Sequence, residues 1–323
     1  MSSKIFVGVV GLGMVGTPVR RWFEEVRGHK RGEELFCYDT DPKLGCFDDV
    51  GKAAVVFVCV PTPPNPNGSC NTSIVESVVS RLPEGRIVVI KSTVPPGTTD
   101  GLQRKFPELK LMFCPEFLTE SQAWADFIKP SRQLIGVTEQ SAPHSIEVLN
   151  LLPQGLFQRP DTPVYGGREV VTATEAELAK YASNVFGALK VVFSNILADI
   201  TWLMTRIAPS VVDYEHVRAM VASDARIGPA WMNVSHGDYA GFGGYCFPKD
   251  TAAFIAFYEK LVMDFHADVK LHPHLGALRA GLDLLKAAYE YNRLLLQAQG
   301  LTVEDVSQHD KLIVLEKRHP VRQ

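Results

Sequence analysis

The chain has 323 residues, of which 46% are hydrophobic and 21% are charged, and its formal net charge is −3. This length exceeds what one hydrophobic core usually organises, so two domains are expected. The charge balance gives no general reason to expect nucleic acid or an anionic membrane as a partner. No apolar run reaches the roughly 20 residues that span a bilayer.

The six cysteines are scattered along the chain and include no C-x-x-C pair. Cys37, Cys59 and Cys114 lie in or beside apolar runs, which is typical of core thiols. The N-terminal Met-Ser-Ser-Lys leads directly into a strand pattern rather than into a signal peptide. Together these features favour a reducing cytoplasm. His272 and His274 have no further ligand motif nearby, so no metal site is predicted.

The first half of the chain alternates short, apolar, β-branched runs with helical patterns. Strands are predicted at 4–10, 34–38, 54–61, 86–91, 109–114 and 133–137, with helices between them that include 18–27, 73–81 and 145–152. This alternation is typical of a parallel sheet covered by helices on both faces. The predicted fold class is therefore α/β, with a Rossmann-type doubly wound sheet over residues 1–170.

The second half is mostly helical. Helices are predicted at 174–207, 211–222, 251–265 and 275–299. The first of these is long for a globular protein, and a helix of that length commonly forms a spine between domains or across a subunit interface. Residues 171–298 are predicted to form a helical domain around this long central helix. Residues 299–323 are predicted to be a short, solvated tail.

The first strand runs into a glycine-rich turn that opens a helix. In such a turn Gly11 permits the tight bend, Gly13 lets a pyrophosphate approach the backbone, and Gly16 allows close helix–strand packing. Asp39, at the end of the next strand, would accept hydrogen bonds from ribose hydroxyls and repel a 2′-phosphate. This favours NAD over NADP, although Lys43 nearby softens the preference. A packing turn without a nucleotide is the alternative reading.

Two further loops follow strand ends, at 60–64 and 91–99. Both are stiffened by proline and carry hydroxyl groups able to hydrogen-bond ribose, phosphate or amide groups. Each alone is an ordinary loop. Ligands of parallel sheets bind where the strands end, so the shared placement of the two loops favours a role in binding.

A second glycine-rich turn carries Cys246, and Asp250 follows four residues later. Glycine permits positive φ and close approach of a ligand to the backbone. If a helix starts at the cysteine, this spacing puts thiol and carboxylate on one face, as it does for Lys180 and Asn184. Each of these residues, considered alone, has an ordinary interpretation. Lys180 would be a solvated lysine, Glu116 and Glu120 would be an exposed pair, and Cys246 would be an inert buried thiol.

A covalent thiol has a clear use in oxidising a primary alcohol to an acid. This oxidation needs two hydride transfers, and a thiolate that adds to the intermediate aldehyde gives a thiohemiacetal from which hydride can leave again. The second transfer yields a thioester, which water must hydrolyse. An ammonium such as that of Lys180 favours the thiolate and stabilises an oxyanion. A carboxylate such as Asp250 or Glu116 can orient or deprotonate the water.

In their order along residues 4–295, these motifs resemble the UDP-glucose/GDP-mannose 6-dehydrogenase family, and most closely its UDP-glucose 6-dehydrogenases. The matching segments are Gly11–Gly16, Val60–Pro63, Lys91–Gly97, Pro115–Glu120, Glu177–Asn184, Asp224–Gly228 and Gly241–Asp250.

The resemblance implies a role for each matching residue. The implied catalytic residues are Cys246 as nucleophile, Lys180 and Asn184 beside the sugar, Asp250 for proton transfer and water activation, Glu116 and Thr93. The implied cofactor-binding residues are Gly11, Gly13, Met14, Val15, Gly16, Asp39, Lys43, Val60, Pro61, Thr62, Ser92, Thr93, Glu120 and Lys249. The implied substrate-binding residues are Glu116, Phe117, Leu118, Thr119, Lys180, Asn184, Arg226, Tyr239, Gly241, Phe242 and Gly243. Arg226 would reach the substrate of a neighbouring subunit.

The implied reaction is the NAD-dependent four-electron oxidation of UDP-glucose to UDP-glucuronate. The same chemistry on another sugar nucleotide or on a smaller phosphorylated alcohol is one alternative, and a non-catalytic NAD-binding scaffold is another. The family's third, base-binding domain is expected to be absent, since the roughly 25 residues from Gln299 onward are too few for it. Relative to the family's pattern, the interval from Arg226 to Cys246 is longer by a few residues, and it includes Trp231 and His236. A homodimer through the long helix is also implied.

Overall fold

The computed structural model describes residues 4–155, 157–158, 171–207, 211–236, 238–264 and 274–307. It divides the chain into two compact units. Unit 1 comprises residues 1–63 and 70–180, and unit 2 comprises residues 64–69 and 181–323. The division falls inside a helix, beyond the predicted boundary at residue 170. Most of the predicted tail and His272 lie outside the described residues.

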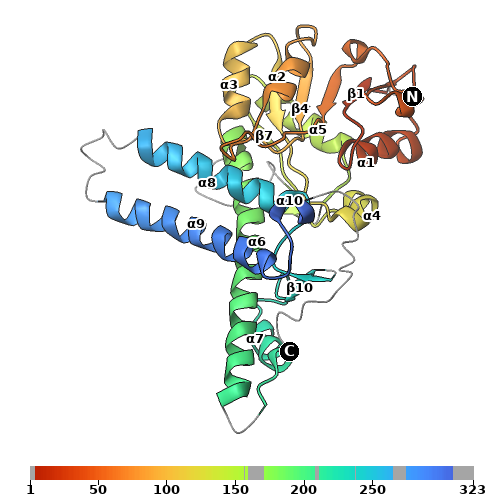
Figure 1. The fold of residues 1–323 in the computed structure, drawn as a ribbon. Helices are drawn as coiled ribbons and strands as arrows, with labels where there is room; N and C mark the ends of the chain where they lie inside the picture. The colour runs from red at the N-terminus through yellow and green to blue at the C-terminus, as the bar shows by residue number, and fades with distance from the viewer. Residues whose placement is uncertain are drawn as a thin grey trace. The chain divides into compact units, whose positions relative to one another are not determined.

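Unit 1 is built on a seven-stranded sheet (Figure 1). The strands, in spatial order, are β2 (Leu35–Tyr38), β1 (Val7–Val10), β3 (Val55–Val58), β4 (Ile87–Ile90), β5 (Lys110–Phe113), β7 (Gly136–Val137) and β9 (Val171–Thr172). The first five pair in parallel, and β7 runs antiparallel to β5. The strand order reverses beside β1, which puts its carboxyl end at the switch point where ligands of such sheets bind.

Helices cover both faces of this sheet, which confirms the predicted doubly wound fold. They are α1 (Gly16–Arg21), which continues as a π-helical turn over Trp22–Val26, α2 (Ser73–Val79), α3 (Thr98–Lys105), α4 (Ala123–Ile128) and α5 (Ser145–Leu151). The core has two clusters, with Val55 and Phe57 in one and Val56 and Val58 in the other. This is the two-residue alternation of a strand buried on both faces.

Unit 2 is mostly helical. It contains the greater part of α6 (Ala173–Ile207), then α7 (Tyr214–Ala222), the hairpin of β10 (Ser235–His236) and β11 (Tyr239–Ala240), α8 (Cys246–Asp264), α9 (Leu275–Gln297) and α10 (Val303–Val306). The long helix is confirmed. Helices α8 and α9 lie side by side and are joined by an ion pair of 2.6 Å between Lys286 and Glu259 (Figure 1).

Helix α8 begins at Cys246, five residues before the predicted start at Thr251. Pro248 does not interrupt it, because the first N–H groups of a helix have no partner within the helix and their loss costs nothing there. The condition for placing the thiol and Asp250 on one helical face is therefore met.

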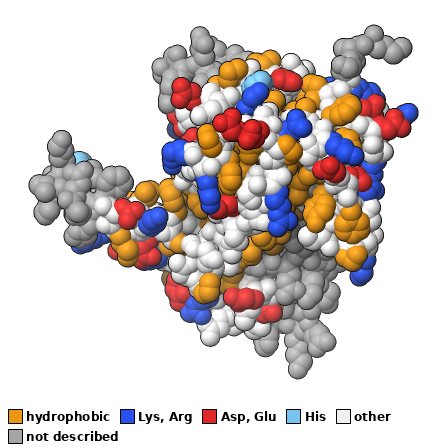
Figure 2. Space-filling view, turned by 90° about the horizontal axis from the view of Figure 1, so that it is seen from above, with side chains coloured by type: hydrophobic (Ala, Val, Ile, Leu, Met, Phe, Trp, Pro, Cys, Tyr) orange, Lys and Arg blue, Asp and Glu red, His pale blue; other side chains and the backbone are white. Residues whose placement is uncertain are grey.

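Helix α6 was not predicted as a membrane span, yet its length and composition would suit one, with a mean hydropathy of 1.4 over its most apolar 18 residues. Half of that window is buried inside the protein. Core helices of water-soluble proteins have the same length and composition. Figure 2 shows acidic and basic side chains interspersed with apolar ones over the face in view, in keeping with the small net charge.

Candidate active site

The glycine turn after β1 has the backbone geometry of a dinucleotide-binding turn. Gly11 has a φ of +84°, and a Cβ there would lie 2.7 Å from the carbonyl oxygen of Cys59. A Cβ on Gly16 would overlap the carbonyl oxygen of Gly11. A Cβ on Gly13, in contrast, would meet nothing within 4 Å. Gly11 and Gly16 are thus required by the fold, whereas Gly13 leaves open space for a ligand, with Met14 and Val15 following it into α1.

The carboxylate of Asp39 is fixed beside this turn. Its Oδ2 accepts the backbone N–H of Leu12 at 2.5 Å, and its Oδ1 accepts that of Asp41 at 2.8 Å. The remaining lone pairs are available to ribose hydroxyls. The exposed Lys43 lies in the short helical turn that follows. The turn and the carboxylate together fit a dinucleotide, with the open space at Gly13 as the decisive feature.

The two proline-stiffened loops are joined to each other. Thr62 donates its hydroxyl to the carbonyl of Thr93 at 2.9 Å, and Ser92 donates to that of Val60 at 2.6 Å. Both hydroxyls belong to buried residues. Their hydrogens are used within the protein, so these residues hold the loops together, and a ligand would meet only their remaining lone pairs. Pro61 is exposed beside them, and Thr93 is half-buried.

A buried ion pair that the sequence analysis missed lies next to these loops. Lys91, fully buried, contacts the carboxylate of Glu116 and donates to the carbonyl of Cys114 at 3.2 Å. Burial lowers the pKa of Lys91, but Cys114 and Glu116 raise it, and the net pKa lies above its ordinary value. The lysine is therefore charged at neutral pH. The side chain of Glu116 is only 11% exposed, so it is not the solvated glutamate of the alternative reading.

Burial also sets the chemistry of the thiols inside unit 1. It raises the pKa of Cys37 and of Cys59 to about 12 and raises that of Cys114 as well. Thiolate is the reactive form of cysteine, so these three side chains are inert at neutral pH. Among the six cysteines, only Cys70 and Cys246 are half-buried rather than buried.

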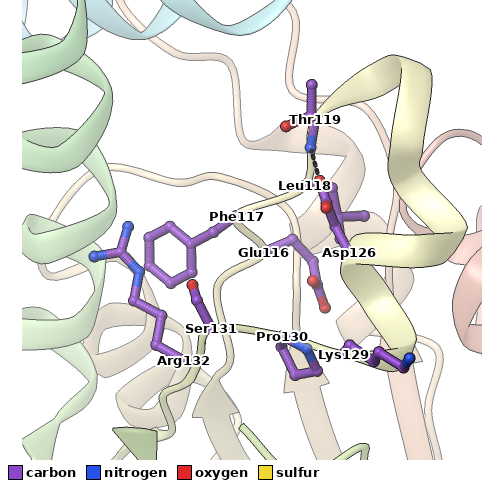
Figure 3. Close-up of a pocket in the computed structure, with 9 residues that line it drawn as sticks. All are labelled: Glu116, Phe117, Leu118, Thr119, Asp126, Lys129, Pro130, Ser131 and Arg132. Carbon is purple, nitrogen blue, oxygen red and sulfur yellow. Dashed lines mark hydrogen bonds between the residues drawn. The ribbon is translucent and has the colours of Figure 1, made fainter. Parts of the chain in front are cut away.

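A cavity of about 250 Å³ opens beside Glu116 (Figure 3). Its lining residues are Glu116, Phe117, Leu118, Thr119, Asp126, Lys129, Pro130, Ser131 and Arg132. Four of them were predicted to bind substrate. The Arg132 guanidinium lies 3.5 Å from the centre of the Phe117 ring, and the Lys180 ammonium lies 5.2 Å from it. Burial lowers the pKa of Arg132. The cavity is thus lined by a guanidinium that lies on an aromatic ring, together with the carboxylates of Glu116 and Asp126, so its lining carries charges of both signs.

Arg132 was missed because its partner Phe117 lies on a different segment, and spacing along the chain gave no signal. Thr119 donates its backbone N–H to Asp126 at 2.8 Å, which fixes the rim of the cavity (Figure 3). Glu120 begins the short helical turn that follows, and its side chain lies outside the described part of the chain.

In unit 2 the structure brings the predicted Asn184 and Asp250 together. The carboxylate of Asp250 is fully buried and accepts from the Asn184 amide at 2.5 Å and from the Lys249 ammonium at 2.5 Å. Cys246 lies one turn earlier on α8, at its first residue. Lys180, 7% exposed, precedes Asn184 by one turn of α6, so it is not a solvated lysine. A thiol at a helix N-terminus and a paired, buried carboxylate are thus presented by one helix.

The rest of the predicted substrate-binding residues have different environments. Tyr239, in β11, and Phe242, in the loop between β11 and α8, are both buried. The Arg226 side chain is 89% exposed and pairs with Asp224 at 2.6 Å. Trp231, in the expanded interval, has a φ of +61°, which is rare for a bulky residue. Its ring centre lies 6.1 Å from that of Phe247, the residue after Cys246.

Glu177 ties the start of α6 to the second loop. Its carboxylate accepts from the N–H groups of Gly97 and Thr99, at 2.6 and 2.8 Å, and from the Thr99 hydroxyl at 2.6 Å. It therefore satisfies N–H groups at the beginning of α3, which have no partner within that helix. Burial raises the pKa of Glu177 from the ordinary 4.5 to about 7, although these hydrogen bonds lower it.

This raised pKa predicts a measurable pH dependence of stability. Between pH 4.5 and about 7 the folded state binds more protons at Glu177 than the unfolded chain does, so this group's contribution falls as pH rises. We expect the free energy of unfolding, relative to that of Glu177→Gln, to decrease by up to about 3 kcal/mol across this window. Urea denaturation of both proteins at several pH values measures it. A relative stability that rises with pH would show that the hydrogen bonds outweigh burial.

Two parts of the chain match the two domain profiles of one protein family. Residues 46–151 match the profile of the UDP-glucose/GDP-mannose dehydrogenase family, NAD binding domain, and residues 174–270 match that of the family's central domain. Among solved structures, a UDP-glucose dehydrogenase from Pyrobaculum islandicum is similar with a TM-score of 0.70 and 30% identity, over 92% of this chain and 70% of that one.

Curated proteins give the same result over a shorter span. A UDP-glucose 6-dehydrogenase from Pseudomonas aeruginosa is 36% identical over 224 residues, covering 64% of this chain and 45% of that protein. Another, AglM from Haloferax volcanii, is 30% identical over 277 residues, covering 79% and 60%. The chain spans about half the length of the first curated relatives it matches.

Proposed function

Because the chain belongs to the UDP-glucose/GDP-mannose dehydrogenase family, whose cofactor is NAD, we propose that it oxidises the C6 alcohol of a nucleotide sugar to the acid. The proposed substrate is UDP-glucose and the product UDP-glucuronate. The observation that carries the proposal is the arrangement on α8, where Cys246 begins the helix and the buried Asp250, bonded to Asn184, follows one turn later. A scaffold that only binds NAD has no use for this arrangement.

In this proposal the residues of unit 1 hold the cofactor. Gly11–Gly16 would take the pyrophosphate on the N-terminus of α1, and Asp39 would take the adenosine ribose. Bound NAD would supply a hydride acceptor for each of the two oxidations.

In this proposal Cys246 would perform the covalent steps, with Lys180, Asp250 and Glu116 in the roles that the family resemblance implies. The sulfur adds to the C6 aldehyde, and the carbonyl oxygen of that aldehyde gains a negative charge that Lys180 stabilises. After the second oxidation the sugar is held as a thioester. Asp250 or Glu116 removes a proton from water, which attacks the thioester carbon and releases the acid and the Cys246 thiolate. The helix N-terminus favours that thiolate as leaving group.

The proposal predicts a fixed stoichiometry. Mixing the protein with NAD and limiting UDP-glucose is expected to form two NADH per sugar consumed, because the aldehyde stays bound to Cys246 between the oxidations. Absorbance at 340 nm, for NADH, and chromatography of the sugar measure both quantities. The control panel is UDP-galactose, UDP-N-acetylglucosamine and GDP-mannose. Faster oxidation of one of these would change the proposed substrate but leave the proposed reaction mechanism as it is. If none of the four sugar nucleotides gave NADH, the result would contradict the proposal and favour a non-catalytic NAD-binding protein.

We also propose that the protein forms a homodimer through α6. An apolar stripe follows one face of this helix and remains exposed, with Phe186 at 61% and Phe193 at 57%, followed by Ile196, Ile200 and Leu203. A second copy of the helix would cover it, and the family resemblance supports this occupant. Sedimentation equilibrium is expected to give twice the chain mass of 35.7 kDa. The mass of a single chain at micromolar concentration would rule the dimer out.

A further inference from the structure

The loop that leads to Cys246 is held by two buried side-chain amides. The Asn292 amide, on α9, accepts the backbone N–H of Phe242 at 2.7 Å and donates to the carbonyl of the same residue at 3.0 Å. Gln299, just after α9, does the same with Ala240, at 2.7 and 3.0 Å. Asn292 is 1% exposed and Gln299 is 4% exposed. Each amide thus pairs with both backbone groups of one residue, as a neighbouring strand would do.

A third backbone contact continues this pattern. Gly244 donates its N–H to the carbonyl of Val306 in α10 at 2.8 Å. Helix α10 is itself fixed by a capping box between Thr302 and Asp305 and by the apolar contact of Val306 with the cluster around Tyr239. Residues 240, 242 and 244, every second residue before the thiol, are therefore hydrogen-bonded to the segment 292–306.

The glycines of the motif make this contact possible. Gly241 has a φ of +103°, and a Cβ there would lie 2.6 Å from Oδ1 of Asn292. A Cβ on Gly243 would lie 2.9 Å from the Cβ of Val306. At both glycines the space that a Cβ would occupy is already filled by the protein itself, so a side chain at either position would displace the loop from its partners. Only at Gly244 does the position of a Cβ meet nothing within 4 Å.

We propose that Asn292 and Gln299 are positioning residues that hold Ala240–Gly244, and with it the first turn of α8, so that the Cys246 thiol stays in one place. A leucine could fill the same volume, but it would leave the N–H and C=O of the loop buried and unpaired. The two amides therefore fix the path of the loop, which a hydrophobic side chain of the same volume would not do. The catalytic consequence rests on the proposed function, because that function assigns Cys246 as the nucleophile, but the hydrogen bonds do not.

The test compares Asn292→Ala and Gln299→Ala with a matched control, Asn195→Ala. Asn195 is also a fully buried amide in unit 2, but it donates to Val191 within α6 at 2.9 Å. The first measurement is amide hydrogen exchange of the peptide spanning residues 239–246. We expect exchange there to rise about tenfold or more in the first two variants and to stay unchanged in the control.

The second measurement is kinetic. With UDP-glucose, kcat is expected to fall about 10²-fold in Asn292→Ala and Gln299→Ala, as a misplaced reacting group predicts, while the KM for NAD stays within about twofold. A fall of similar size in Asn195→Ala would mean that the loss is only one of general stability. Faster local exchange with undiminished kcat would also overturn the proposal.

A third measurement separates this proposal from the proposed function. If the wild-type protein oxidises no sugar nucleotide, the function fails, but the alkylation of Cys246 by iodoacetamide, measured relative to that of Cys70 by peptide mass spectrometry, still tests the positioning. In both variants the loop loses its hydrogen bonds to an amide, so Cys246 is expected to react about tenfold faster relative to Cys70. An unchanged ratio would overturn the positioning role.

Discussion

Replacing Cys246 with alanine is expected to lower kcat for UDP-glucose oxidation by about 10⁴-fold or more, the order of loss seen when a covalent nucleophile is removed. Without the sulfur, the aldehyde has no group to make it tetrahedral, so the second oxidation stops. The glycine turn and Asp39, which fit NAD, lie in unit 1 and are not touched by the substitution, so NAD affinity, measured by calorimetry, is expected to be unchanged. Any residual NADH is expected to fall below two per sugar.

The control for this variant is Cys70→Ala, the removal of the other half-buried thiol. It removes a thiol of similar accessibility and is expected to keep the wild-type rate. Acid formation at the wild-type rate in Cys246→Ala would refute the covalent mechanism. Loss of NAD binding in that variant would instead indicate damage to the fold.

A pair of glycine substitutions is expected to separate stability from cofactor binding. In Gly16→Ala the new Cβ would overlap the backbone carbonyl of Gly11, an atom that no side-chain rotation can move away. We expect a loss of about 4 kcal/mol or more in the free energy of unfolding, or no folded protein. In Gly13→Ala the Cβ enters open space, so stability is expected to change by less than about 1 kcal/mol.

The same Gly13→Ala methyl group occupies the space through which a pyrophosphate would approach the backbone. NAD affinity is expected to fall about 10²-fold, which is about 2.7 kcal/mol of binding free energy. Thermal denaturation gives the stability of each variant, and titration calorimetry gives the affinity. Undiminished NAD binding by a stable Gly13→Ala protein would contradict the assignment of this turn to the cofactor.

The sheet and the long helix were predictable because their signals are local. A buried parallel strand such as Val55–Val58 needs an unbroken apolar run, and α6 needs apolar residues at helical spacing without a proline, so both leave patterns over adjacent residues. The start of α8 was missed for the opposite reason. Pro248 normally ends a helical pattern, and only the turn before Cys246 shows that this proline lies in the first turn of a helix.

The supporting residues could not be predicted, because their partners are distant in the sequence. Asn292 bonds to a residue 50 positions away and Gln299 to one 59 positions away. Lys91 was read as the last residue of a strand and the first of a loop, and nothing in its sequence neighbourhood shows that it is buried against Glu116. Residue types in ordered motifs indicated the chemistry. The contacts that position those residues depend on tertiary packing.

The inert thiols of the sheet have a consequence for the protein under oxidative stress. Hydrogen peroxide attacks thiolates, and burial keeps Cys37, Cys59 and Cys114 in the neutral form that it attacks slowly. Oxidation to sulfenic acid is thus directed toward the two more accessible sulfurs, one of which is the proposed nucleophile. Oxidation of the proposed nucleophile would therefore lower the rate of catalysis before the buried core thiols were oxidised. Reduction by a small thiol would restore that rate without refolding of the protein.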